Sequence, residues 1–189
     1  MEVYKYKDYD DYIKWQKKIN KSKKGWVYVK ERTIENISKE CPFASQILCH
    51  GTRAGAEQKY FKKYLPSAEI IGTEIGDNAL EYKMTIQHDF NKQLPEFINR
   101  FDIVYSNSFD HSANPEETLK VWKDQLNNSG KLFLEFNERD SVPNYAPDPV
   151  CATNKEIEKL LIQENLNVIK KLTEGNMSGG VVFVCKKGK

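Results

Sequence analysis

The chain has 189 residues, which is enough for one domain with its own hydrophobic core. Hydrophobic residues make up 39% and charged residues 30%, an ordinary composition that excludes collagen, coiled coil and disorder. No apolar run approaches the roughly 18 residues that a membrane-spanning helix needs, so we expect no membrane association. The net charge of +2 argues against a dedicated nucleic-acid-binding protein.

The first forty residues predict a helical extension that is rich in aromatic and basic side chains. Apolar residues at helical spacing cover 9–19, Gly25 interrupts the pattern, and a second helix is expected at about 30–39. Residues 1–41 carry 11 Lys and Arg against 7 Asp and Glu, with five lysines between 17 and 24. The lysines indicate either a solvated helix end or a contact for an anionic acceptor. The aromatic residues indicate either packing on a sheet or a cap over an acceptor site.

From residue 46 onwards, short apolar runs alternate with helical stretches. The runs that predict strands are 46–50, 69–73, 84–87, 101–105, 131–136, 167–172 and 181–185. The stretches that predict helices are 54–64, 78–82, 95–99, 115–126 and 153–163. This alternation predicts an α/β domain over 44–189, preceded by the extension at 1–43, with a parallel sheet covered by helices on both faces. The last two strands are close in sequence, so we expect them to pair antiparallel.

The cysteines and histidines do not form the pattern of a disulfide framework or a metal site. The cysteines are far apart and include no CxxC pair: Cys41, Cys49, Cys151 and Cys185. The first five residues lack the apolar core of a secretory signal, so we expect reduced thiols in the cytoplasm. No metal is expected, because no two histidines are paired at ligand spacing: His50, His88 and His111.

Glycines and acids follow the ends of three consecutive predicted strands. Gly51 and Gly55 lie in the turn after 46–50, where a glycine lets the backbone approach a ligand. Glu74 ends the second strand, 23 residues after Gly51, and an acid there accepts both hydroxyls of a ribose. Asp89 ends the third strand and fits the exocyclic amine of an adenine, with Phe90 as an apolar face. Because ligands bind beyond the carboxyl ends of parallel strands, these features predict a site for an adenosine-containing cofactor.

These segments resemble the class I S-adenosylmethionine-dependent methyltransferases, especially the type 11 group. The resemblance covers roughly 46–136 and is carried by 47–57 (ILCHGTRAGAE), 71–74 (IGTE), 88–90 (HDF), 101–106 (FDIVYS), and the run from His111 through 115–119 (PEETL) to 126–130 (LNNSG). It implies a Rossmann-like, mostly parallel sheet of seven strands with the last strand antiparallel. It also implies S-adenosyl-L-methionine as the cofactor and S-adenosyl-L-homocysteine as the product.

The resemblance assigns cofactor-binding residues by position. Gly51, Thr52 and Gly55 would line the methionine part, with Arg53 in the same turn, Glu74 would hold the ribose, Asp89 and Phe90 the adenine, and Ser106 would face the methyl group. Two residues depart from the family pattern. Cys49 stands where an acid is usual, and Arg53 stands where a small residue is usual. That acid helps to organise the amino-acid end of the cofactor, so its loss bears on affinity rather than on the fold.

Asp110 and His111 are the candidate catalytic residues, because they follow the fourth predicted strand. A histidine there is able to take a proton from a hydroxyl or amine acceptor, with Asp110 orienting it. Acceptor binding and packing are the alternative roles for His111. We interpret His50 and His88 as structural.

We therefore expect O- or N-methylation of a small-molecule acceptor. The residues at 106–109 (SNSF) contain neither the Asn-Pro-Pro-aromatic motif of amino-group methylases nor a catalytic cysteine. Three alternatives remain. The first is an inactive cofactor- or partner-binding relative, and the second is an NAD-dependent oxidoreductase, against which the broken glycine pattern counts. The third is an RNA methyltransferase that uses the lysines, which is less favoured. The acceptor and the oligomeric state stay open.

Overall fold

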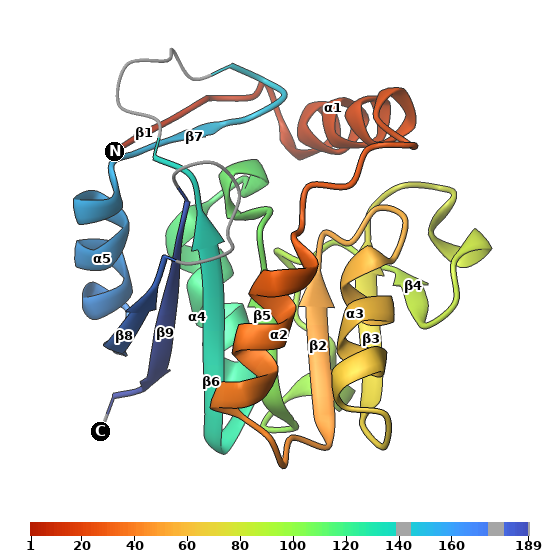
Figure 1. Ribbon diagram of the computed structural model, residues 1–189. Helices are drawn as coiled ribbons and strands as arrows, with labels where there is room; N and C mark the ends of the chain where they lie inside the picture. Colours follow the sequence, from red (N-terminus) through yellow and green to blue (C-terminus); the bar gives the residue numbers. More distant parts are fainter. Residues whose placement is uncertain (139–144, 174–179, 189) are drawn as a thin grey trace.

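The computed structural model describes residues 1–138, 145–173 and 180–188. At its centre lies a seven-stranded sheet with the strand order β4-β3-β2-β5-β6-β9-β8 (Figure 1). Its strands are β2 (Gln46–His50), β3 (Glu69–Glu74), β4 (Thr85–Gln87), β5 (Phe101–Ser106), β6 (Leu126–Phe136), β8 (Leu166–Leu172) and β9 (Val181–Lys187). β9 lies antiparallel between β6 and β8, and the pairs from β4 to β6 are parallel. The predicted sheet, with its last strand reversed, is confirmed.

Alternate residues of the strands enter two separate cores, one on each face of the sheet. On one face, Leu48 and Val104 pack with Trp122 of α4 (Pro115–Gln125) and with α5 (Asn154–Gln163). On the other face, Ile47 and Ile103 pack with α2 (Glu31–Glu40) and α3 (Ala56–Tyr64). A strand covered on both faces reads as a continuous apolar run, which is what the sequence shows at 46–50.

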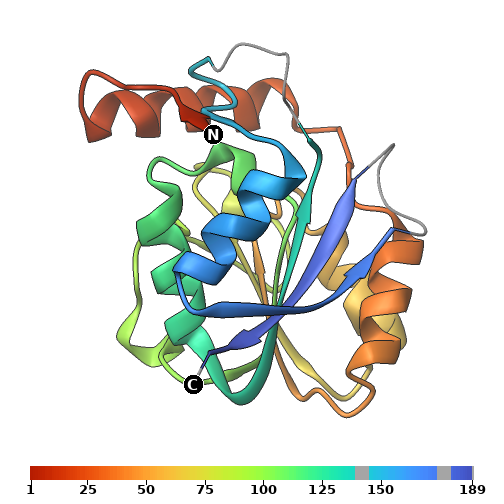
Figure 2. The same ribbon diagram turned by 90° about the vertical axis from the view of Figure 1, so that its left-hand side faces the viewer.

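The amino-terminal segment divides into two parts with different neighbours. α1 (Tyr9–Ser22) lies across the carboxyl ends of the strands, as Figures 1 and 2 show, whereas α2 belongs to a helical layer of the sheet. The Lys17 and Lys24 ammonium groups pair with Asp77 and Glu81 beyond the end of β3, at 2.5 and 2.7 Å. These two lysines of the cluster therefore attach α1 and the residues after it to the rest of the chain.

The structure contains two short strands that the sequence did not reveal. β1 (Glu2–Val3) pairs antiparallel with β7 (Val150–Cys151), above the carboxyl edge of the main sheet. Two-residue strands are too short to show a hydrophobic period, so pattern analysis cannot find them. β7 lies at the end of a proline-rich stretch, 137–151. Residues 139–144 of that stretch lie outside the described part.

Several predicted boundaries shift. The helices expected at 78–82 and 95–99 are single 3-10 turns, η1 (Ala79–Glu81) and η2 (Pro95–Phe97), and a third, η3 (Phe109–His111), follows β5. β6 begins at Leu126, the expected end of the helix at 115–126, because the chain there already pairs with Phe101 of β5. Thr153 and Glu156 form a capping box at the start of α5. Within the described residues, no helix is both long and apolar enough to span a membrane.

Candidate functional site

The turn between β2 and α3 is built on two glycines in left-handed conformation. Gly51 has φ +71° and Gly55 has φ +72°, a region that favours glycine. The N–H groups of Gly51 and Thr52 both donate to the Thr73 carbonyl, at 2.9 and 3.1 Å, which ties the turn to β3. A Cβ on Gly51 would lie 2.6 Å from the Cβ of Ser108, so the turn packs directly against the segment after β5.

Glu74 connects this turn to the end of β3. Its Oε2 accepts from the Arg53 N–H at 2.8 Å and its Oε1 accepts from the Gly76 N–H at 2.9 Å. The side chain is only 6% exposed, yet it lines a cavity. A carboxylate oxygen has room for two donors, so each oxygen keeps a lone pair for a ligand hydroxyl.

Asp89, beyond the end of β4, is held by α1 as well as by its own loop. Its Oδ2 accepts from the Tyr9 hydroxyl at 2.7 Å, and its Oδ1 accepts from the N–H and side-chain amide of Asn91 at 3.0 and 2.7 Å. The Asn91 amide also donates to the hydroxyl of Tyr12, which is almost fully buried. The aromatic residues of α1 therefore lie directly over the end of the sheet.

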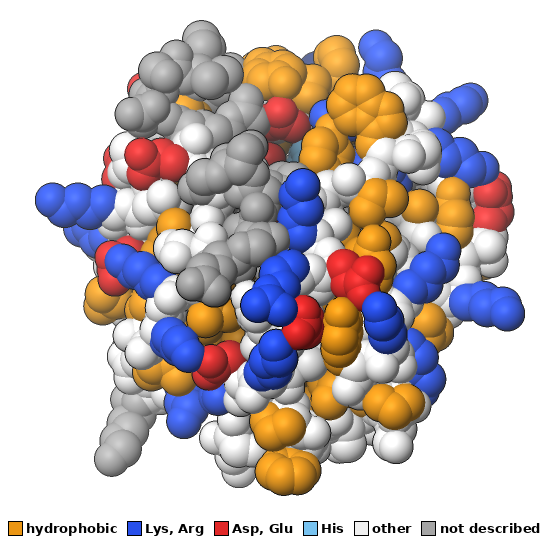
Figure 3. Space-filling model, in the orientation of Figure 1, with side chains coloured by type: hydrophobic (Ala, Val, Ile, Leu, Met, Phe, Trp, Pro, Cys, Tyr) orange, Lys and Arg blue, Asp and Glu red, His pale blue; other side chains and the backbone are white. Residues whose placement is uncertain are grey.

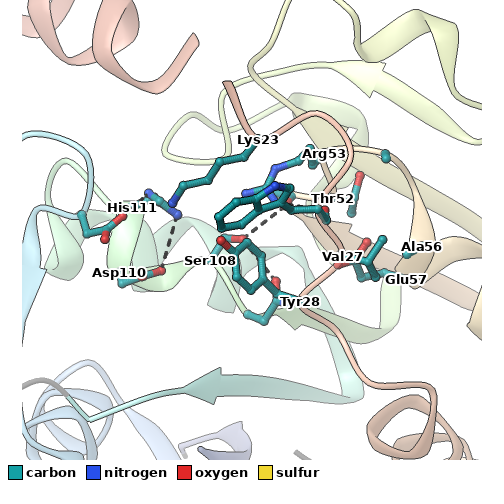
Figure 4. Close-up of a pocket in the computed structure, with 15 residues that line it drawn as sticks. Lys23, Val27, Tyr28, Thr52, Arg53, Ala56, Glu57, Ser108, Asp110 and His111 are labelled. Atoms are coloured by element: carbon teal, nitrogen blue, oxygen red, sulfur yellow. Dashed lines mark hydrogen bonds and ion pairs between the residues drawn. The ribbon is translucent and has the colours of Figure 1, made fainter. Parts of the chain in front are cut away.

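Two adjoining cavities lie at this edge of the sheet. Cavity 1 has Thr52, Glu57 and Asp110 among its wall residues. Cavity 2 has Glu74, Asp89 and Phe90 among its wall residues and is covered by α1. The two cavities share four wall residues: Gly51, Arg53, Ser108 and His111. Figure 4 shows cavity 1 with His111 and Asp110 on one side and with Ala56 and Glu57 on the other.

His111 lines both cavities, and its two ring nitrogens have different neighbours. Its Nδ1 lies 2.8 Å from the Pro147 carbonyl, which only accepts hydrogen bonds, so the neutral ring carries its proton on Nδ1 and a lone pair on Nε2. The orienting contact predicted for Asp110 is thus made by Pro147, and the Asp110 Oδ1 lies 3.9 Å from Nε2. No local pattern predicts the Pro147 contact, because Pro147 lies 36 residues further along the chain.

Asp110, His111 and Asp148 also form a group that is able to hold a metal ion. One ligand atom of each residue lies within 4.8 Å of the other two. No metal was expected, because the search of the sequence relied on histidine and cysteine spacing and Asp148 is remote in sequence. Lys23 lines the same cavity and reaches towards this group in Figure 4, so an ammonium competes with a cation there.

His50 is a structural residue, as expected. Its ring stacks on Trp122 with centroids 4.9 Å apart, and its nitrogens lie 2.8 Å from the Thr73 hydroxyl and the Gln125 carbonyl oxygen. Burial lowers the pKa of His50 to about 3, so the ring stays neutral at physiological pH. His88 holds the carbonyl of Lys92 at 2.8 Å, away from both cavities.

Two predicted site residues lie outside the cavity walls. Ser106 is fully buried, donates to the His50 carbonyl at 3.1 Å and accepts from the Ser108 N–H at 3.0 Å. Gly55 is buried at the start of α3. Neither lines either of the two cavities, whereas Ser108, two residues beyond Ser106, lines both. The cofactor contacts assigned to Ser106 and Gly55 stay predictions.

The rim of cavity 1 is aromatic and basic. Trp26 is 60% exposed and lies beside Tyr28, with ring centroids 6.0 Å apart. The Arg53 guanidinium lies 5.0 Å from the Tyr28 ring and donates to the Trp26 carbonyl at 3.1 Å, so it fixes this segment over the glycine turn. Figure 3 shows hydrophobic side chains gathered at the top of the molecule, the end that carries this rim, while Lys and Arg side chains are spread over the face among acidic ones.

Glu57 is a site residue that sequence reasoning missed. It lies in the first turn of α3, is 6% exposed and lines cavity 1. The motif 47–57 includes Glu57, but the family pattern assigns cofactor contacts to the glycine turn and an acid to position 49, and no role to position 57. Cys49 itself is fully buried beneath the turn, and burial raises the pKa of its thiol well above the usual range.

Solved structures share this architecture at low sequence identity. 1,6-Didemethyltoxoflavin-N1-methyltransferase of Burkholderia thailandensis, solved with 1,6-didemethyltoxoflavin and S-adenosylhomocysteine, is 13% identical, with a TM-score of 0.70 over 95% of this chain and 87% of that chain. A SAM-dependent methyltransferase from Aquifex aeolicus is 20% identical, with a TM-score of 0.60 over 80% of this chain and 88% of that chain. A proposed methyltransferase, in complex with the Haloferax volcanii activator Trm112, is 14% identical, with a TM-score of 0.67 over 95% and 98%.

These similarities define the class of fold. No protein-family model and no curated protein sequence matches the chain. The strand order, the reversed β9 and the similarity to these solved structures show that the chain has the class I S-adenosylmethionine-dependent methyltransferase fold.

Proposed function

We propose that the protein is a methyltransferase that binds S-adenosyl-L-methionine and methylates an oxygen or nitrogen atom of a small molecule. The observation that carries this proposal is the convergence of the glycine turn, Glu74 and Asp89 on two cavities that share Gly51 as a wall. These are the three features that an adenosine-containing cofactor requires, in the order in which the strands present them.

The residues around the cavities fit the parts of this cofactor. Cavity 2 would take the nucleoside, because the lone pairs of Glu74 and Asp89 accept from ribose hydroxyls and from an adenine amine, and Phe90 offers an apolar face. Cavity 1 would take the methionine part beside Thr52. The acceptor would enter past Trp26 and Tyr28, whose rings suit a planar molecule.

Methyl transfer would need two things from the protein: alignment of the acceptor with the methyl group, and removal of one proton from the acceptor. The cofactor supplies a methyl group on a sulfonium, which accepts the electron pair of the breaking carbon–sulfur bond. The chain's residues hold the acceptor nucleophile in line with that bond, which supplies much of the rate. His111 takes the proton that the acceptor oxygen or nitrogen loses, at Nε2, while Pro147 keeps the ring oriented through Nδ1.

A catalytically inactive, cofactor-binding relative is the second candidate. It is favoured by Cys49 in the place of an acid and by Arg53, whose guanidinium occupies the wall between the two cavities. An RNA acceptor has less support, because Lys17 and Lys24 are paired with acidic side chains.

We further propose a reducing, cytoplasmic setting and a division into a cap at 1–43 and a methyltransferase domain at 44–189. All four cysteines are free thiols, as a reducing compartment requires. Within the cap, the segment from α1 to Tyr28 reaches the cavities, and α2 supports the sheet.

Calorimetric titration with S-adenosylhomocysteine tests the proposal without knowledge of the acceptor. We expect saturable binding with one ligand per chain. Binding followed by methyl transfer to small-molecule acceptors supports the enzyme, whereas binding without transfer to any of a broad acceptor panel favours the inactive relative. The absence of binding would refute both candidates.

A further inference from the structure

Glu57 carries a buried carboxylate oxygen that nothing in the described structure satisfies. The side chain is 94% buried, and its Oε2 has no hydrogen-bond partner. Burial of a carboxyl group without a partner is unfavourable, and native structures rarely keep such a group without a reason. The reason is not local packing, because a Leu or Met at this position would fill the same space at lower cost.

The position of Glu57 points to a ligand in cavity 1. It lies in the first turn of α3, directly after the glycine turn, and forms part of the cavity wall beside Thr52 and Ala56 (Figure 4). The helix dipole favours an acid in a first turn, which explains the charge but not the unpartnered oxygen inside the molecule. The Oε2 has almost no accessible surface, so a hydrogen-bond donor in cavity 1 would satisfy it once the Glu57 side chain turns towards the cavity.

The charges around cavity 1 specify what that ligand carries. The walls carry the cations Lys23 and Arg53 and the acids Glu57, Asp110 and Asp148, so they complement a group that bears both signs. Of the three acids, Glu57 is the one with a buried, unpartnered oxygen among the described residues. A free amino-acid end, with its ammonium and its carboxylate, is such a group. Cys49, on β2, lies close enough to Glu57 for the carboxylate to raise the pKa of the thiol.

We propose that Glu57 binds the α-ammonium group of the cofactor's methionine part and replaces the acid that Cys49 does not provide. This inference rests on the proposed function, since it assigns one contact within the same site. Arg53 and Lys23 lie in the same cavity and face the α-carboxylate of that ligand.

The protonation state of Glu57 in the free protein gives the proposal a second readout. Burial raises the pKa of Glu57 to about 8, and the charges of Glu74 on β3 and Glu135 on β6 add to this, while the Arg53 guanidinium opposes it. Cys49 on β2 and Tyr105 on β5 also face it and stay neutral, because burial raises both of their pKa values. At pH 7 the empty site therefore holds a protonated carboxyl group, which an arriving ammonium ionises.

The experiment compares two ligands that differ only in the part at issue. S-adenosylhomocysteine carries the amino-acid end and 5′-methylthioadenosine lacks it. We expect Glu57→Gln to weaken the affinity for S-adenosylhomocysteine about tenfold or more and to leave the affinity for 5′-methylthioadenosine unchanged. Glu116→Gln, in the exposed first turn of α4, is the matched control and should change neither affinity.

Calorimetry of S-adenosylhomocysteine in buffers of different ionisation enthalpy gives the second readout. At pH 7 we expect release of about one proton on binding to the wild type and none for Glu57→Gln. An unchanged affinity of Glu57→Gln for S-adenosylhomocysteine would overturn the proposal, and so would an equal loss for both ligands, which would mean that Glu57 acts through the shape of the site. A wild type that binds neither ligand would refute the proposed function instead.

Discussion

The carboxylates in the two cavities on either side of Gly51 differ in their hydrogen-bond partners. In cavity 2, both oxygens of Glu74 and of Asp89 accept hydrogen bonds from the chain itself. In cavity 1, Glu57 is as buried as Glu74, and no described residue gives its Oε2 a hydrogen-bond partner. The first arrangement holds the acids in place before a ligand arrives, and the second leaves an acid for the ligand to satisfy. If the cofactor binds as we propose, its nucleoside would meet carboxylates that are already held in place, and its amino-acid end would meet a carboxylate that lacks a partner.

Gly51→Val should have the largest effect, because it breaks the wall that both cavities share. Its Cβ would meet Ser108 at 2.6 Å, and φ +71° strains any β-branched residue. We expect the affinity for S-adenosylhomocysteine to fall more than a hundredfold in calorimetry. Gly25→Val is the control, since nothing lies within 4 Å of a Cβ there, and it should bind normally. Normal binding by a folded Gly51→Val protein would show that this turn is not the site.

His111→Asn should separate chemistry from binding. It removes the Nε2 lone pair that receives the acceptor proton, so turnover should fall about a hundredfold. The affinity for S-adenosylhomocysteine should hold, because the acids of both cavities remain. His88→Asn, outside both cavities, is the control. Full turnover by the His111 variant would make this residue structural, and a loss of cofactor affinity would place it in the cofactor site.

Glu74→Ala should weaken the binding of the nucleoside part, which we place in cavity 2. The variant loses the ribose acceptor and leaves the N–H groups of Arg53 and Gly76 unsatisfied. We expect the affinity for 5′-methylthioadenosine to fall about ten- to a hundredfold, equivalent to roughly 1.5–3 kcal/mol. Glu69→Ala, at the opposite end of the same strand, should leave that affinity unchanged. An unaltered affinity in the Glu74 variant would contradict its role at the ribose.

Glu57→Gln should change how stability depends on pH, even without a ligand. The folded pKa of about 8 lies above the ordinary value of 4.5, so the unfolded chain loses this proton first. In the wild type, the free energy of unfolding should fall by up to about 1.4 kcal/mol per pH unit between pH 4.5 and 8 and level off above pH 8. Glu57→Gln should lack this contribution. Urea denaturation of Glu57→Gln and of Glu116→Gln at pH 5.5, 6.5 and 7.5 checks this. Equal slopes in both variants would contradict the account.

The sequence predicted the sheet, and eight of the ten predicted site residues line the two cavities, because strand ends and glycine turns are local features. Glu74 and Asp89 follow strands whose apolar runs are plain, and parallel strands bring such ends to one edge. Glu57 was not predicted as a site residue, because the neighbouring residues do not show that an acid in the first turn of a helix is buried. Pro147 and Asp148 were not predicted either, because their contact with His111 joins distant segments. Contacts of that kind depend on tertiary packing, which no short pattern records.

A crystal structure of the chain with S-adenosylhomocysteine tests the central claim most directly. The account predicts the adenine amine at Asp89, the ribose hydroxyls at Glu74 and the α-ammonium within hydrogen-bond distance of Glu57. A ligand bound away from the edge of the sheet at Gly51, or with its amino-acid end turned away from cavity 1, would contradict it.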